Sequence, residues 1–261
     1  MTDRIKNRQM NRKYKTPSIQ KILTVLLGIF IILLGISLWS RSHPIEAHAP
    51  SPAIDENSTE ETNSSEPLPS ELTEPSSVTV LVDKYHSLPA DYVPSDLAEP
   101  YVNSTGEVIQ VSAKAADSLK ELINAANEAE IPIYLTGGYI SYDTQEDYYL
   151  ARAKLVGEAE ASKTTPKAGY SEHQTGLAVD FSNEPTGLGI SASFAETDTG
   201  KWLYAHAHEY GFILRYPEGK ESITGYSYFP WHYRYVGKDI ASAMYEKSPD
   251  LTFEEYFNIA N

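Results

Sequence analysis

The 261-residue sequence contains no cysteine, which excludes disulfides, thiol nucleophiles and metal sites built on thiolates. Positive charge is also scarce, because 21 Lys and Arg face 36 Asp and Glu and give a formal net charge of −15. Because the N-terminal residues are basic, the remainder of the chain is more acidic than the net charge alone indicates. Nucleic acid is therefore disfavoured as a partner of the C-terminal part.

The first 39 residues differ from the rest of the chain. Residues 1–21 contain a single acid, Asp3, against Arg4, Lys6, Arg8, Arg12, Lys13, Lys15 and Lys21. Residues 22–39, ILTVLLGIFIILLGISLW, carry no charge. About 18 apolar residues at roughly 1.5 Å each are long enough to cross the hydrocarbon core of a bilayer. We expect a cytoplasmic tail over 1–21 and a transmembrane anchor over 22–39, with everything after it outside the cell membrane and facing the cell wall.

Two alternatives compete with the anchor. A cleaved signal peptide is compatible with Ala47-His48-Ala49, a small-x-small cleavage site. That site lies well past the apolar run, however, and both the basic region and the apolar run are long for a signal, so the anchor is favoured. A buried helix of a soluble domain is disfavoured because no face of the segment is polar.

The next segment has the composition of a linker. Residues 42–78 are rich in Ser, Pro, Thr and Glu and contain no Lys or Arg. Such a segment buries too little apolar surface to offset its chain entropy. We predict a disordered acidic linker over 40–77, which typically spans about 30–35 Å. A globular domain follows over 78–261.

Within residues 78–261 the pattern predicts both helices and strands. Apolar spacing indicates helices over 112–130, 145–160 and 200–211, the last ending at Gly211, and a short helical tail. Strands are expected in IPIYLTGGY (131–139), in GLAVDFS (176–182) and at the start of FILRYPEG (212–219), and VTVLVD (78–83) reads as a strand or an extended arm. Because the two types do not alternate regularly, the fold class is α+β in a single domain.

The residues with the clearest chemistry lie in SEHQTGLAVDF (171–181) and PWHYRYVG (230–237). If 176–182 is a strand, Ala178 and Asp180 lie on the same face, and Gly176 lets His173 turn back toward Asp180. With His232 as a third ligand, two imidazoles, one carboxylate and an open position would form a catalytic zinc site. Taken singly, each residue is more often structural, and the joint pattern is what indicates a metal.

The chain resembles the VanY-type D-alanyl-D-alanine carboxypeptidases, which include bacterial L,D-carboxypeptidases of cell-wall stem peptides. The similarity runs from about Leu81 to about Gly237 and rests on LVDKYHSLPADYVPSDL, GGYISYDTQ, AGYSEHQTGLAVDF, YGFILRYPEGKESITGYSY and PWHYRYVG. It implies His173, Asp180 and His232 as zinc ligands, a peptidoglycan stem peptide as partner, and a small hedgehog-like domain with a central, mainly antiparallel sheet and flanking helices. In these motifs, the candidates for substrate binding are Tyr139, Ser141, Gln145, Ser171 and Trp231.

Two departures from the family pattern bear on activity. The family has a glutamate three residues before the last histidine, in E-P-W-H, as the general base that activates the metal-bound water, and here that place holds Phe229. The family also has an arginine in S-G-Y-R-S-Y that contacts the substrate or its developing charge, and here GGYISY places Ile140 there. A phenyl ring cannot take a proton, so we predict no catalytic base at this position and impaired activity.

No other carboxylate is a clear substitute for the missing base. Glu172, Glu184, Glu209 and Glu221 lie near the motifs in sequence, but no spacing aims them at the metal, and we expect solvated surface charges. Three functions therefore remain: a zinc carboxypeptidase, a membrane-tethered pseudopeptidase that binds wall peptide or a partner protein without hydrolysis, and a metal-free structural protein. The third is least favoured because all the ligand types are present.

Overall fold

The computed structural model describes residues 67–102, 106, 108–184 and 191–259. The chain divides into two compact units, residues 1–64 and 65–261, and the described residues belong to the second. In that described part, no helix is long and apolar enough to cross a membrane. The expected cytoplasmic tail, the anchor over 22–39 and most of the linker lie outside the described residues.

The centre of the domain is a four-stranded antiparallel sheet with strand order β3-β4-β6-β5. Its strands are β3 (Tyr134–Gly137), β4 (Ala178–Ser182), β5 (Phe212–Leu214) and β6 (His232–Tyr235). A separate antiparallel hairpin joins β1 (Leu97–Val102) to β2 (Val108–Ser112). The predicted α+β class and the mainly antiparallel sheet are confirmed.

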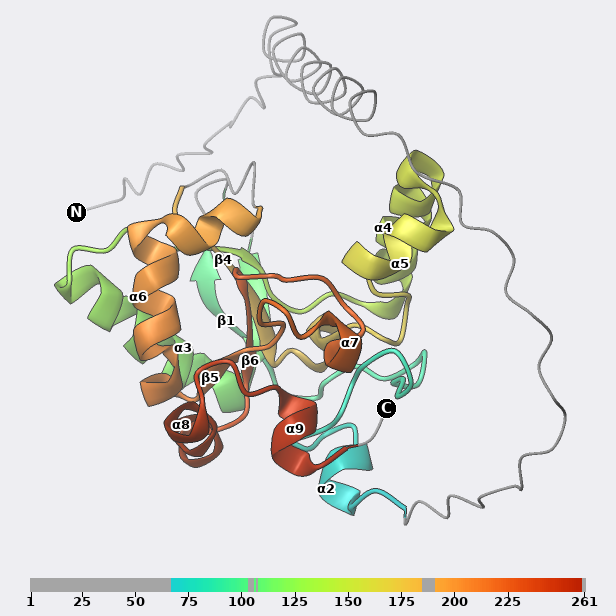
Figure 1. Cartoon of the computed structure of the whole chain (residues 1–261), viewed down its shortest axis with the longest axis horizontal. Coiled ribbons are helices and arrows are strands. Elements are labelled where there is room, and N and C mark those ends of the chain that lie inside the picture. The colour runs from blue at the N-terminus through green and yellow to red at the C-terminus, as the bar shows by residue number, and fades with distance from the viewer. Residues whose placement is uncertain (1–66, 103–105, 107, 185–190, 260–261) are drawn as a thin grey trace, which may run out of the picture. The chain divides into compact units, whose positions relative to one another are not determined.

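Helices flank the sheet. They are α3 (Ala113–Glu128), α4 (Tyr142–Val156), α5 (Glu158–Thr164), α6 (Asp198–His206), α7 (Glu221–Thr224), α8 (Lys238–Lys247) and α9 (Phe253–Phe257). In Figure 1, α3, α6 and α8 lie to one side of the strands, whereas α4 and α5 lie to the other. The strands that carry the predicted site therefore run between these two groups of helices.

The main core lies between α3, α6 and the sheet. Ala115, Leu119, Leu122 and Ala126 form the buried stripe of α3, and they pack with Phe181 of β4 and other apolar residues in one cluster. Ile123 is only partly buried, at the edge of this cluster. Ser112 begins the helix, because its side chain accepts a hydrogen bond from the Lys114 backbone N–H. The stripe fixes α3 behind the sheet.

Several element boundaries differ from the prediction. The helix expected over 145–160 begins earlier and is divided into α4 and α5 at Gly157, whose positive φ of 85° no helix accommodates. The helix expected over 200–211 is α6 followed by a 3₁₀ turn (Ala207–Tyr210), and it ends at Gly211 as predicted. The tail forms two helices, α8 and α9. The hairpin of β1 and β2 was not predicted.

The N-terminal part of the domain is an extended arm and not a strand. The backbone carbonyls of Val78 and Val80 both accept hydrogen bonds from the Nη2 of Arg234 at 2.9 Å. Before the arm, α2 (Ser70–Thr73) buries Leu72 in a second apolar cluster with Leu81, Met244 and Phe253. Residues 67–77 were expected within the disordered linker, so for them that prediction is wrong: the folded part begins before Val78.

Candidate metal centre and its cavity

The strand register brings the predicted ligands together. β4 and β6 pair so that Asp180 lies directly opposite His232. His173 lies in a short 3₁₀ turn, η1 (Glu172–Thr175), which Gly176 ends in the left-handed conformation with φ of 68°. A β-carbon at Gly176 would lie 2.8 Å from the backbone nitrogen of Ser112, so only glycine allows this close turn into β4.

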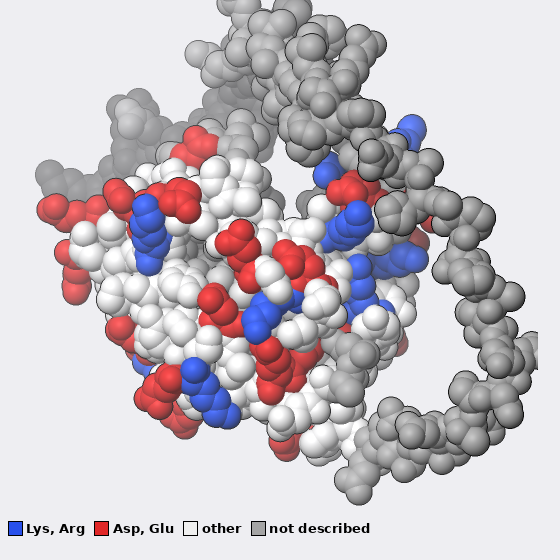
Figure 2. Space-filling view, viewed as in Figure 1, with Lys and Arg blue, Asp and Glu red and all other residues white. Residues whose placement is uncertain are grey.

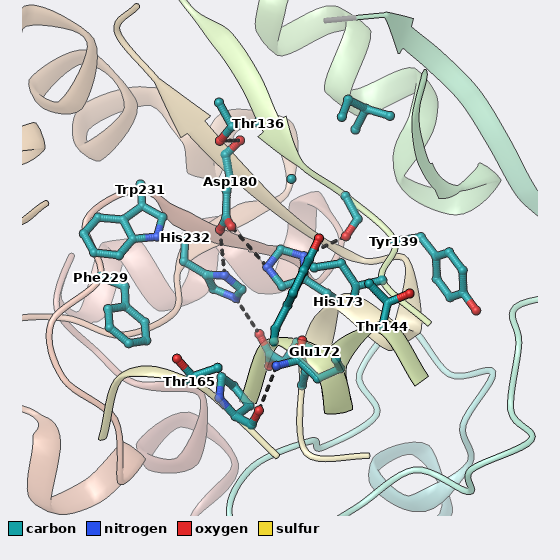
Figure 3. A pocket seen from close by; sticks show the side chains of 18 of the residues that line it. Thr136, Tyr139, Thr144, Thr165, Glu172, His173, Asp180, Phe229, Trp231 and His232 are labelled. Carbon is teal, nitrogen blue, oxygen red and sulfur yellow. Dashed lines mark hydrogen bonds and ion pairs between the residues drawn. The ribbon is translucent and has the colours of Figure 1, made fainter. Parts of the chain in front are cut away.

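The carboxylate of Asp180 lies between the two imidazole rings (Figure 3). Its Oδ1 is 3.0 Å from His232 Nδ1, and its Oδ2 is 3.3 Å from His173 Nε2. The two rings are nearly perpendicular, with centroids 4.9 Å apart. One ligand atom from each of the three residues lies within 4.8 Å of the other two.

The outer nitrogen of each ring has its own acceptor. His173 Nδ1 lies 2.7 Å from the backbone carbonyl of Gly138, and His232 Nε2 lies 3.3 Å from Glu172 Oε2. An acceptor on the outer nitrogen holds the proton there and turns the lone pair of the other nitrogen inward. Donor atoms on one tetrahedral zinc ion are about 3.3–3.5 Å apart, close to the separations across Asp180. The residues present therefore fit a metal ion of the zinc type.

Glu172 is not the solvated surface charge that the sequence suggested. Only 2% of the residue is exposed. Its Oε1 accepts hydrogen bonds from Arg215 Nε at 2.7 Å and from Arg234 Nη1 at 2.9 Å, and its Oε2 faces His232. Arg215 in turn forms a two-pronged ion pair with buried Glu254, at 2.7 and 3.0 Å. The buried charges of Glu172, Arg215, Arg234 and Glu254 thus balance, and we call these four residues the buried ion network.

The buried ion network also fixes the charge of Glu172. Burial alone would raise the pKa of this carboxyl, but Arg215 and Arg234 hold the pKa well below its usual range. Burial likewise opposes the ionisation of Asp180, whereas the two histidines hold its pKa well below its usual range. Both groups are therefore carboxylates at neutral pH, and Glu172 is a weak proton acceptor because its charge is already shared by two guanidinium groups.

A cavity of about 520 Å³ opens beside the three ligand residues. All five residues expected to bind substrate line it: Tyr139, Ser141, Gln145, Ser171 and Trp231. Two of them also have structural hydrogen bonds. The Ser141 hydroxyl accepts from the Thr144 backbone N–H at the start of α4, and the Gln145 side-chain amide donates to the Pro166 carbonyl at 2.7 Å. Their side chains thus hold the cavity wall in shape.

Phe229 and Ile140 both line this cavity. The Phe229 ring is 8% exposed and packs with Tyr216 and Tyr226 in an aromatic cluster, with Trp231 partly buried against it. Ring centroids lie 5.2 Å from Trp231, nearly parallel, and 5.4 Å from Tyr216, nearly perpendicular. Phe229 is therefore a well-packed residue of the cavity wall, beside His232 (Figure 3).

The cavity wall contains few acidic residues. In the described part of the chain, Glu172 and Asp180 are the only carboxylates that line the cavity. Glu184, Glu209 and Glu221 are exposed and line no part of it, as expected. Since Asp180 faces both imidazoles and Glu172 is held by arginines, neither carboxylate is free to accept a proton from a ligand in the cavity. Recognising Glu172 from sequence would have required noticing that Arg215 directly follows the apolar strand β5 and that Arg234 lies in β6.

Comparison with known proteins places this chain in a family. The model of the VanY family, described as D-alanyl-D-alanine carboxypeptidase, matches residues 108–238. The chain is 43% identical over 187 residues to the putative carboxypeptidase YodJ of Bacillus subtilis strain 168, covering 70% of this chain and 68% of that protein. The chain therefore belongs to the VanY family of D-alanyl-D-alanine carboxypeptidases, and the resemblance seen in the sequence is confirmed.

Solved structures agree with this assignment. The LD-carboxypeptidase LdcB, whose structure concerns peptidoglycan recognition, is 42% identical with a TM-score of 0.66, over 72% of this chain and 88% of that chain. A mutant of the vancomycin-resistance D,D-pentapeptidase VanY in complex with Zn(II) is 31% identical with a TM-score of 0.58, over 69% of this chain and 98% of that chain. The α+β domain described above is thus the fold of this family.

Proposed function

We propose that this chain is a membrane-anchored member of the VanY family that holds zinc through His173, Asp180 and His232. In the adjoining cavity it binds the end of a peptidoglycan stem peptide and hydrolyses it slowly or not at all. The observation that carries the proposal is the ligand triad at the wall of a cavity in which Phe229 occupies the place of the base. Family membership and the peptidoglycan-directed neighbours support the ligand class.

The residues of the chain have separable roles in this proposal. Zinc, when bound, supplies a Lewis acid that polarises a peptide carbonyl and lowers the pKa of bound water. Gly138 and Glu172 orient the rings of His173 and His232 for that ion through their outer nitrogens. The stacked rings of Phe229 and Trp231 give the peptide an apolar wall. Phe229 accepts no proton, so this position would neither take a proton from a water nor return one to a leaving amine.

A direct test uses the full-length chain, purified in mild detergent and loaded with zinc. Calorimetric titration with a stem pentapeptide ending in D-Ala-D-Ala is expected to show binding, while hydrolysis stays below about 1 s⁻¹. Asp180→Asn removes the central carboxylate and is expected to abolish both zinc retention and peptide binding; Asp143→Asn, at the exposed start of α4, is the matched control. No binding by the zinc-loaded wild type would refute the proposal.

We also propose that residues 22–39 anchor the chain in the cell membrane, with the domain outside. The supporting observation is the basic segment before an uncharged apolar run. The native protein is expected to sediment with membranes after alkaline washing and to be cleaved by protease added to intact cells from which the wall has been removed. Deleting residues 22–39 should leave it in the soluble fraction. A mature chain found in the medium and starting after Ala49 would show instead that the segment is a signal peptide.

A further inference from the structure

The described lining of the cavity beside the metal ligands contains no Lys or Arg side chain. Ile140 lies where the family places an arginine. A stem peptide carries carboxylates, and a carboxylate taken out of water needs a charged or hydrogen-bonding partner. A carboxylate of a bound peptide that does not reach the metal therefore finds its nearest Lys or Arg next to the cavity and not in it.

Such counter-charges are found in an adjoining hollow of about 320 Å³. We call it the lysine hollow, and it is lined by Lys84, Ser162, Thr165, Lys167, Tyr170 and Tyr226. Thr165 lines both spaces, so the segment around it forms a shared wall. In Figure 2, basic side chains gather on the side of the molecule that carries α4 and α5.

The lysine hollow is a built feature, because hydrogen bonds hold its three segments together. The Leu88 backbone N–H donates to the Gly169 carbonyl at 2.8 Å, and the Ser227 N–H donates to the Lys163 carbonyl at 3.0 Å. The hydroxyl of buried Tyr226 reaches the Tyr170 carbonyl at 3.4 Å. These bonds join the arm after Val82, the end of α5 and the loop after α7, so the lysines are carried by a fixed frame.

Lys84 is held over this frame by close packing. Its stem crosses Gly225, where a β-carbon would lie 2.8 Å from Lys84 Cδ, and the backbone there has a positive φ of 76°. Its ammonium group lies 4.9 Å from the centre of the Tyr226 ring. Burial, and to a smaller extent the charge of nearby Lys163, lower the pKa of Lys84.

Among the described ion pairs, none includes Lys84 or Lys167. The pairs nearest to them in sequence, His86 with Asp83 and Lys163 with Glu160, leave both ammonium groups out. The Lys167 ammonium group lies 5.6 Å from the centre of the Tyr149 ring. Two unpaired ammonium groups beside the hydroxyls of Ser162 and Thr165 match the charge and hydrogen-bonding needs of a carboxylate. In a chain with a net charge of −15, this local excess of positive charge is an exception.

We propose that the lysine hollow binds a carboxylate of the peptide whose end occupies the adjoining cavity, so that the protein selects acidic wall peptides over their amidated forms. This inference rests on the proposed function, because it needs a peptide in the cavity. It assigns to Lys84 and Lys167 the contact with the ligand's negative charge. Phosphate could supply the same charge from another source, and the experiment therefore includes it.

The experiment compares two probes on the zinc-loaded full-length chain. They are L-Ala-γ-D-Glu-L-Lys-D-Ala-D-Ala and the same peptide with its free glutamate carboxylate amidated. The wild type is expected to bind the acidic peptide about 5- to 20-fold more tightly, as two half-exposed charge contacts allow. Lys84→Met with Lys167→Met should reduce that preference to less than about twofold and leave the amidated peptide's affinity unchanged.

The matched control is Lys247→Met. Lys247 also lies over a tyrosine ring, 4.8 Å from the centre of Tyr256, but it lines neither the cavity nor the hollow. Lys167→Met alone changes an exposed position, so it keeps the test valid if Lys84→Met disturbs folding. We expect it to reduce the ratio of the two peptide affinities to about the square root of the wild-type ratio. The preference should persist in Lys247→Met.

The outcomes separate this inference from the proposed function. If neither peptide binds the wild type, the proposed function fails and the inference fails with it. If both peptides bind equally, or if the double variant keeps the wild-type preference, the hollow is not a carboxylate site and the proposed function stands. Tight binding of inorganic phosphate that the double variant loses, without any preference between the peptides, would identify a phosphate site and overturn the inference.

Discussion

Phe229→Glu is expected to raise the carboxypeptidase rate of the zinc-loaded protein by about 10²–10⁴, because it restores a proton acceptor beside the metal ligands. The position is suited to the test, since Phe229 lines the cavity and its backbone is fixed by hydrogen bonds to Tyr216 and His232. The measurement is the steady-state rate on the stem pentapeptide at saturating zinc. Thermal unfolding of each variant shows whether the aromatic cluster tolerates the change.

Adding Ile140→Arg to Phe229→Glu should raise the rate further, by far more than it does in the wild type. An oriented cation that stabilises developing charge is worth roughly 2–4 kcal/mol, by analogy with oxyanion donors. Since base and cation act on one transition state, their effects are coupled and not additive. Phe229→Gln is the control, because it introduces a polar side chain of similar shape to glutamate that cannot serve as a base.

Two results would contradict this reading of the site. A wild-type turnover of about 1 s⁻¹ or more would mean that another group serves as the base. Equal rates for Phe229→Glu and Phe229→Gln would mean that the gain comes from removing the ring and not from proton transfer. Either result would mean that Phe229 does not occupy the position of the base.

Glu172→Gln is expected to lower zinc affinity by about 10- to 100-fold, because the carboxylate that orients His232 is lost. The same change leaves Arg215 and Arg234 short of a counter-charge, so the free energy of unfolding should fall by about 3–5 kcal/mol. Zinc affinity is measured by competition with a fluorescent chelator, and stability by denaturant unfolding of the metal-free chain.

Glu254→Gln separates the two effects. Glu254 pairs with the same Arg215 and is equally buried, but its hydrogen bonds do not reach His232. Like Glu172→Gln, it should lower the free energy of unfolding by about 3–5 kcal/mol. Zinc affinity should fall only as far as the lost stability accounts for. Glu121→Gln, whose pair with Lys238 has the same 2.7 Å distance but side chains 50–55% exposed, should cost at most about 1 kcal/mol. Equal losses of zinc affinity in Glu172→Gln and Glu254→Gln would mean that Glu172 acts only through stability.

The sequence was informative wherever local rules decide the structure. The apolar spacing of α3, the glycine after the 207–210 turn and the alternation in β4 each depend on neighbours a few residues away. The metal motif could also be recognised in the sequence. Gly176 indicates the close turn, and the spacing of Ala178 and Asp180 indicates that they share one face of the strand. The α+β class followed from these elements and needed no knowledge of how they pack.

Long-range partners explain what the sequence did not reveal. Glu172 lies in a polar stretch and looks exposed, and its burial depends on arginines 43 and 62 residues further along the chain. Leu72 lies in a segment with the composition of a linker, and it is buried only because α9 and α8 return to cover it. Gly157 divides a helix whose periodicity continues across it. For Glu172 and Leu72 the deciding contacts are tertiary and leave no trace in local propensity, whereas Gly157 acts locally through its positive φ.

The packing of α2 decides where a soluble fragment of this protein should begin. A fragment cut at Val78, where the composition changes, would expose the apolar surface that Leu72 covers on Leu81, Met244 and Phe253. It would also free the end of the arm whose carbonyls saturate the guanidinium of Arg234, and Arg234 holds Glu172 behind the metal ligand His232. A fragment that keeps residue 67 onward preserves both. Trimming the chain past residue 67 would therefore also disturb the residues that support His232 in the candidate metal centre.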